Sequence, residues 1–131
     1  ITDRLIEGAQ RALREHGAVA TDVETIRVPG AWELPQAAAR AAESERFDAI
    51  VALGCVIRGE TPHFEYVCSE ASRGLGAVAR AARVPVAFGV LTTDDDEQAR
   101  ARAGAGPDNK GYEAALAALE MVAVYRTLGA Y

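Results

Sequence analysis

Apolar residues recur every three or four positions at the start of the chain, which is the spacing of one face of an α-helix. Ile1, Leu5, Ala9 and Leu13 follow this spacing, and Gly17 interrupts it. A glycine commonly closes a helix because it adopts the left-handed backbone conformation without strain. The pattern therefore predicts an opening helix that ends near Gly17.

Three later stretches have the apolar character of β-strands, namely residues 23–28, 49–57 and 85–91. The middle stretch is apolar without interruption, whereas a strand with one solvent-exposed face would alternate apolar and polar residues. This predicts a parallel strand buried on both faces. Helical patterns separate and follow these strands. They cover residues 34–46, a segment from His63 to the Val84-Pro85 pair, residues 97–103 and residues 112–128, with a loop rich in glycine, proline and asparagine at 104–111.

This alternation predicts an α/β fold, a three-layer α/β/α sandwich with a parallel, flavodoxin-like sheet. The order nevertheless starts with a helix, and three strands are few for a sheet covered on both faces. We therefore expect an N-terminal strand that is missing from residues 1–131. A length of 131 residues with 50% apolar residues is that of a single domain.

Charge and hydrophobicity narrow the possible partners. The chain has 14 basic and 19 acidic residues, and this net charge of -5 argues against nucleic acid. The longest apolar stretch, residues 49–57, is far shorter than the roughly 20 residues of a membrane-spanning helix, and no basic-then-apolar leader opens the chain. We expect a cytoplasmic protein without a membrane partner. Cys55 and Cys68 lack the spacing of a zinc site or redox pair, so we expect reduced thiols and no metal.

Ligands of open parallel sheets bind beyond the carboxyl ends of the strands, so the loops at 28–33, 55–63 and 88–93 are expected to open on one edge. His63 lies where a loop becomes a helix, a position that suits proton transfer at neutral pH and equally suits a surface or capping histidine. The preceding residues 59–61 offer backbone N–H groups and a hydroxyl to an anion. An ordinary capped helix start has the same features.

Other side chains are weaker candidates when taken singly. Arg102 could clamp a phosphate through its planar guanidinium, although arginines on helices are commonly solvated or paired, and Arg58 and Lys110 have the same status. Glu33 could accept hydrogen bonds from a polyol, or lie exposed in the first turn of a helix. Trp32 and Phe88 are more typical of packing than of ligand stacking.

Taken together, three separated blocks make the chain resemble the lumazine synthase family. They are VPGAWELP at 28–35, GCVIRGETPHFEYV at 54–67, and FGVLTTDDDEQARARAG at 88–104 followed by NKGYEAALAALEM at 109–121. The resemblance implies an enzyme that condenses 5-amino-6-(D-ribitylamino)uracil with 3,4-dihydroxy-2-butanone 4-phosphate. The products would be 6,7-dimethyl-8-ribityllumazine, phosphate and water, in the penultimate step of riboflavin biosynthesis, without a cofactor.

The resemblance also implies a role for each matching position. His63 corresponds to the proton-transferring residue, and Arg102, with Glu60 and Thr61, to the binding site of the butanone phosphate. An aromatic residue that stacks on the pyrimidine is expected before Ile1. The residues that correspond to the ribitylaminouracil site are Ala31, Trp32, Glu33, Cys55, Val56, Ile57 and, from a neighbouring subunit, Phe88.

The family implies a homopentamer with sites shared between subunits, and in some members a 60-subunit shell. The short loop at 104–110 is compatible with the shell. Three other readings stay open: a non-catalytic flavin- or lumazine-binding module, a shell-forming scaffold with a vestigial pocket, and a flavodoxin-like redox protein. The presence of both His63 and Arg102 argues against the binding module, and the chain lacks an obvious electron-transfer feature.

Overall fold

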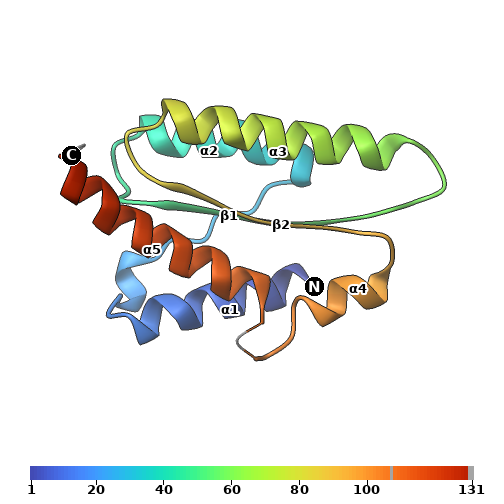
Figure 1. Cartoon of the computed structure of the whole chain (residues 1–131), viewed down its shortest axis with the longest axis horizontal. Helices are drawn as coiled ribbons and strands as arrows, with labels where there is room; N and C mark the ends of the chain where they lie inside the picture. The colour runs from blue at the N-terminus through green and yellow to red at the C-terminus, as the bar shows by residue number, and fades with distance from the viewer. Residues whose placement is uncertain (107, 130–131) are drawn as a thin grey trace.

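The computed structural model describes residues 1–106 and 108–129, and it places two parallel strands between two layers of helices (Figure 1). The α/β class and the three-layer arrangement predicted from the sequence are confirmed. The elements in chain order are α1 (Thr2–Glu15), the 3₁₀ turns η1 (Ala20–Asp22) and η2 (Ala31–Glu33), α2 (Leu34–Glu43), β1 (Ile50–Ile57), α3 (His63–Ala81), β2 (Val86–Thr93), α4 (Asp96–Ala101) and α5 (Lys110–Leu128).

The two strands are parallel and in full register. Ile50 lies opposite Val86 at the start of the pair, and Ile57 lies opposite Thr93 at its end. A parallel pair needs a crossover connection, and α3 supplies it. Both strands therefore end at the same edge of the sheet, from which the chain continues into α3 and α4 (Figure 1).

Each face of the sheet carries its own apolar cluster. Helices α2 and α3 cover one face, and α1, α4 and α5 cover the other (Figure 1). Toward α2 and α3 the buried residues are Ala38, Ala52, Leu75 and Val90. Toward the other layer they include Leu5, Leu91, Ala99 and Ala103. Because both faces are covered, the strands read as apolar runs without alternation, as the sequence predicted for 49–57.

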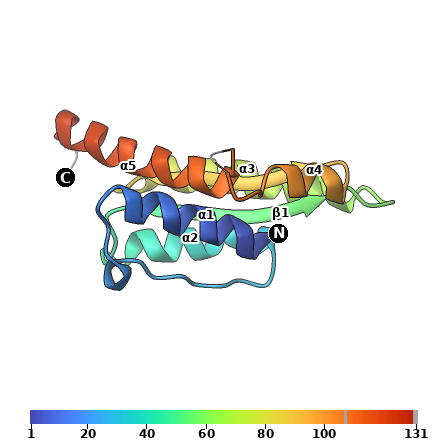
Figure 2. The same ribbon diagram turned by 90° about the horizontal axis from the view of Figure 1, so that it is seen from below.

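The segment 23–28, predicted to be a strand, is not one. It follows η1 and leads to η2, and in Figure 2 it runs along the lower border of the molecule, below α1 and α2 and in the same direction as β1. Within the described residues the sheet has two strands, so this segment forms no ladder. An apolar, β-branched sequence such as VETIRV favours extended backbone, but a strand exists only when a neighbouring edge accepts its hydrogen bonds.

The predicted helix ends shift by a few residues. The helix predicted over 34–46 stops at Glu43, because the Ser44 hydroxyl donates to the Ala41 carbonyl and Glu45 has a φ of 60°. The closing helix runs from Lys110 to Leu128, and Gly129 caps it with a φ of 75°, the left-handed conformation that glycine favours. Of the predicted loop at 104–111, position 107 lies outside the described residues.

The first and last helices are joined by a close backbone approach. A Cβ atom on Gly111 would fall on the backbone carbonyl of Leu5, so only glycine allows this crossing of α1 and α5. Asn109 lies beside it, 2% exposed, and caps α5 by accepting a hydrogen bond from the Tyr112 N–H at 3.0 Å. Its amide nitrogen also donates to the Arg4 and Gly104 carbonyls, at 3.1 and 2.8 Å. These contacts fix the layer that carries α4.

Candidate functional site

The carboxyl edge of the sheet carries the residues of the middle sequence block. Residues 58–62 form the loop from β1 into α3, and all of them are exposed. His63 is the first residue of α3, and its side chain is exposed. Its backbone N–H donates to the hydroxyl of Thr61 at 3.4 Å, so Thr61 satisfies one of the free donors at the start of the helix. The structure thus presents His63, Glu60 and Thr61 to solvent at one end of the sheet.

The last residues of β1 offer backbone as well as side chains. Cys55 and Val56 are half-buried and Ile57 is exposed. One edge of β1 pairs with β2, and within the described residues no strand pairs with the other edge. A further strand, such as the N-terminal strand expected from the sequence, could pair with that other edge. Burial raises the pKa of the Cys55 thiol, and burial does the same at Cys68, so both free cysteines keep their protons at neutral pH.

The first sequence block forms the 3₁₀ turn η2, which contacts α3 and β1. Ala31 and Glu33 are half-buried, whereas Trp32 is 48% exposed. The packing role expected of Trp32 is thus incomplete in the single chain. Leu34, which follows directly, packs on the cluster between the sheet and α3, and this contact fixes the position of η2.

Arg102 lies at the end of α4, in the other helical layer of the chain from α3 (Figure 1). It is the residue that closes α4, it is exposed, and its guanidinium donates to the Gln98 carbonyl at 3.0 Å. Helix α4 covers the face of the sheet opposite to α3 (Figure 1). The structure therefore places Arg102 and His63 on opposite sides of the sheet of one chain.

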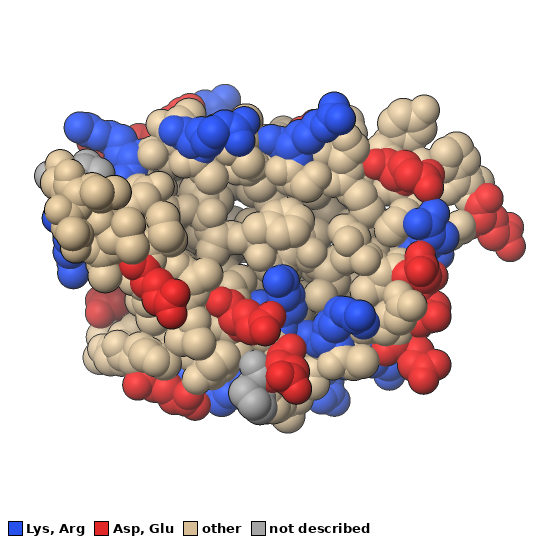
Figure 3. All heavy atoms as spheres, viewed as in Figure 1, with Lys and Arg blue, Asp and Glu red and all other residues tan. Residues whose placement is uncertain are grey.

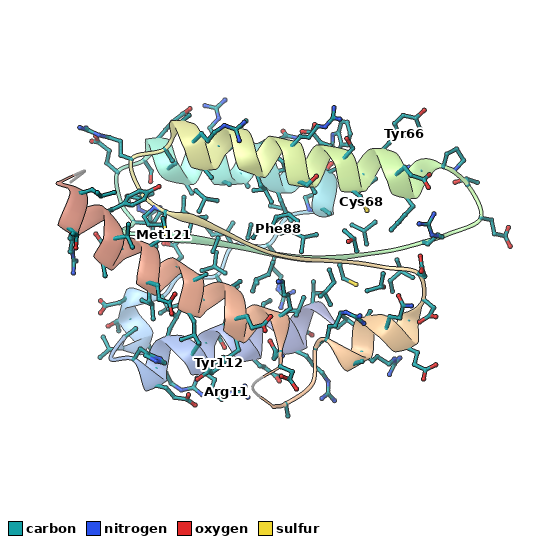
Figure 4. The ribbon with its side chains drawn as sticks, viewed as in Figure 1. Arg11, Tyr66, Cys68, Phe88, Tyr112 and Met121 are labelled. Carbon is teal, nitrogen blue, oxygen red and sulfur yellow. The ribbon has the colours of Figure 1, made fainter. Side chains whose placement is uncertain are left out.

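Phe88 lies neither in the loop before α3 nor on α4. It lies on β2, is 41% exposed, and points toward α3 at the open edge of the strand (Figure 4). A shallow groove of about 370 Å³ runs there between α3 and β2. Its lining residues are Ser72, Leu75, Gly76, Ala79, Val86 and Phe88. Figure 3 shows that the centre of this face has few charged side chains.

Arg58 forms the densest polar network at the carboxyl edge, a role that its sequence position did not reveal. Its Nε donates to Asp94 Oδ1 and its Nη1 to Glu65 Oε1, both at 2.9 Å. The guanidinium carbon also lies 4.6 Å from the centre of the Phe64 ring. The hydrogen bond to Asp94, then that to Glu65, raises the pKa of Arg58. With two carboxylates already bound, Arg58 is a poor phosphate clamp, contrary to one of the sequence-based alternatives.

Within residues 1–106 and 108–129, no three His, Cys, Asp or Glu side chains gather as metal ligands would. In the same part of the chain, no helix combines the length and apolar character needed to cross a membrane.

The fold and this loop-bordered edge, with an exposed histidine at a helix start, define an α/β protein of the class whose ligand sites lie beyond the carboxyl ends of the strands. A sequence model of the 6,7-dimethyl-8-ribityllumazine synthase family matches residues 1–126 of the 131. The chain belongs to this family, whose members are transferases of riboflavin biosynthesis.

Proposed function

We propose that the chain, as one domain over residues 1–131, condenses 5-amino-6-(D-ribitylamino)uracil with 3,4-dihydroxy-2-butanone 4-phosphate. The observation that carries the proposal is the exposed His63 at the start of α3, beside the free end of β1, in a chain of this family. The product is 6,7-dimethyl-8-ribityllumazine. The cytoplasmic location expected from the sequence stays a prediction.

The two substrates react readily with each other, so the protein needs mainly to orient them and to transfer protons. The 5-amino group attacks the ketone and water leaves to give an imine. Phosphate is then eliminated, and ring closure by the second amine releases another water, so atoms balance as one lumazine, one phosphate and two waters. His63 moves protons between these nitrogen and oxygen atoms. The binding residues mainly hold two reactive molecules in the right orientation.

The ribitylaminouracil site comprises the η2 residues and the end of β1. Ala31, Trp32 and Glu33 bind the ribityl chain and the pyrimidine, with backbone and side chain of residues 55–57 along the ring. This assignment is supported by the half-exposed Trp32 and by the position of residues 55–57 at the carboxyl end of β1, which contacts η2.

The butanone phosphate site uses two chains. Glu60 and Thr61 contribute the backbone N–H groups and hydroxyl of the loop before α3, and Arg102 of a neighbouring copy contributes the positive charge. The separation of Arg102 from His63 by the sheet of one chain supports a shared site. Phe88 of a neighbour would close the uracil side in the same way, and its exposure supports this.

The shared sites require an assembly, for which we propose a homopentamer that in turn can form a 60-subunit shell. An exposed apolar stripe supports association, because Met121, Val124 and Leu128 are three and four residues apart on α5 and are all exposed. Met121 and Phe88 lie on the same face of the molecule (Figure 4). Association would cover both.

The test is to mix the purified protein with both substrates and follow lumazine fluorescence against a protein-free control. Acceleration over the control is the expected result. A His63→Ala variant should lose about 10²-fold in kcat, the lower end of the range for an acid/base residue, because orientation is retained. His16→Ala is the matched control, since His16 lies at the end of α1 with its Nδ1 2.8 Å from the Ala12 carbonyl. No acceleration by an assembled protein, or an unchanged rate in His63→Ala, contradicts the proposal.

A further inference from the structure

We propose that Arg58 is a positioning residue that holds the start of α3, and with it His63, at the carboxyl edge of the sheet. The inference rests on the proposed function, since it concerns the placement of His63 in that reaction. It starts from the network that joins Arg58 to Asp94, Glu65 and Phe64.

Arg58 connects three elements at the point where they diverge. Its own backbone N–H donates to the Thr93 carbonyl at 2.8 Å, which extends the β1–β2 ladder by one bond. Its side chain then reaches Asp94, directly after β2, and Glu65, in the first turn of α3. A single guanidinium thus links the ends of both strands to the beginning of the helix.

The loop between Arg58 and His63 has little support of its own. Residues 59–62 are exposed, and a Cβ atom on Gly59 would meet nothing within 4 Å. The position of His63 therefore depends on how the first turn of α3 is anchored. Phe64, the next residue, is 8% exposed beneath the guanidinium, and Glu65 is bound beside it.

The network is suited to placing atoms and contributes little to overall stability. The side chains of Arg58, Glu65 and Asp94 are 48%, 61% and 64% exposed, and solvent screens such ion pairs. Bonds through both Nε and Nη1 fix the orientation of the guanidinium plane, which a lysine cannot reproduce. An error of about 1 Å in the place of a catalytic group can cost roughly 10²-fold in rate.

The chain contains a matched control at the other end of the sheet. Arg46 binds Glu24 at 2.6 Å, and its guanidinium carbon lies 4.8 Å from the centre of the Phe47 ring. This arginine has one carboxylate partner and one ring where Arg58 has two carboxylate partners and one ring, and it lies just before β1 begins, at the opposite end of the strand from His63. Arg46→Ala therefore removes a comparable network without touching the carboxyl edge.

The experiment is a double-mutant cycle between Arg58→Ala and His63→Ala, read as kcat and KM for both substrates. Arg58→Ala should lower kcat about 10- to 100-fold on the native background and less than about 3-fold on the His63→Ala background, because the residue acts through His63. Arg58→Lys, Asp94→Asn and Glu65→Gln should each give partial losses, and Arg46→Ala none.

Three outcomes overturn the proposal while leaving the proposed function intact. One is an equal loss of kcat on both backgrounds, and another is a loss equalled by Arg46→Ala. The third is a raised KM for the butanone phosphate at unchanged kcat, which would make Arg58 a phosphate ligand. If Arg58→Ala does not fold, the cycle is run with Asp94→Asn and Glu65→Gln under the same criteria. An inactive native enzyme would instead refute the proposed function.

Discussion

Asn109 shows how much one buried amide can do in this protein. It caps α5, holds the Gly104 carbonyl of the preceding loop, and reaches across to the Arg4 carbonyl of α1. Gly8 provides the space for this side chain, because a Cβ atom at position 8 would overlap the Asn109 amide. The sequence predicted a loop at 104–111 and a helix after it. Asparagine is common at the position before a helix, so a capping role for Asn109 could be expected from the sequence. The link to α1 could not be predicted, because it depends on how two distant helices pack.

Replacing this amide should be costly. Asn109→Ala removes the cap and leaves two carbonyls without their donor in a buried place, so we expect the free energy of unfolding to fall by about 2–4 kcal/mol. Asn109→Asp should lose at least as much, because its carboxylate still accepts from the Tyr112 N–H but sets a charged oxygen against the Arg4 and Gly104 carbonyls. Urea denaturation followed by circular dichroism measures both.

The matched comparison is Asp95, which caps α4 with one hydrogen bond to the Gln98 N–H at 2.8 Å and is exposed. Asp95→Ala should destabilise the protein clearly less than Asn109→Ala. Equal losses would mean that Asn109 acts as a cap alone.

At the scale of elements, periodicity predicted helices well and strands less well. A helix satisfies its own backbone, so apolar spacing and a stop signal such as Gly17 suffice to locate α1. A strand is completed by a neighbour, and the apolar segment 23–28 has none within the described residues. For the same reason 49–57 and 85–91 were located to within one or two residues, because each is the neighbour of the other.

The crossing of α1 and α5 allows a sharp test of packing. Gly111→Ala places a methyl group on the Leu5 carbonyl, which is backbone and cannot turn aside, so the helices must separate. We expect a loss of about 3 kcal/mol or more in the free energy of unfolding. Gly104→Ala is the control, since a Cβ there meets nothing within 4 Å, and its stability should stay equal or rise slightly. Equal stability of the two variants would show that α1 and α5 do not approach as described.

At the scale of the whole molecule, the sequence grouped residues that one chain keeps apart. Similarity of motifs assigned His63 and Arg102 to a single reaction, and spacing alone could not reveal that the sheet lies between their helices (Figure 1). The apolar stripe on α5 was equally hidden, because apolar residues on a helix are normally read as facing the core of their own chain.

A shared site predicts rescue between two inactive variants. Chains with His63→Ala and chains with Arg102→Ala, each expected to be impaired, should regain activity when co-expressed, because some interfaces then pair a native His63 with a native Arg102. For a random mixture in a ring, roughly a quarter of the sites are native. Lumazine formation by the purified mixture is the measurement. Activity no greater than that of the separate variants would place both residues in sites within one chain.

The packing of α1 on α5 also sets an order in time. These helices lie at opposite ends of the described chain, and the buried face of α1, with Ala9 and Ala12, packs against Ala115 of α5. During synthesis on the ribosome α1 emerges before α5, and all the elements described between them are made in the interval. Leu5 can meet Leu91 of β2 earlier, but Ala9 and Ala12 lack Ala115 until α5 is made, so the layer opposite α3 closes only after α5 has left the exit tunnel.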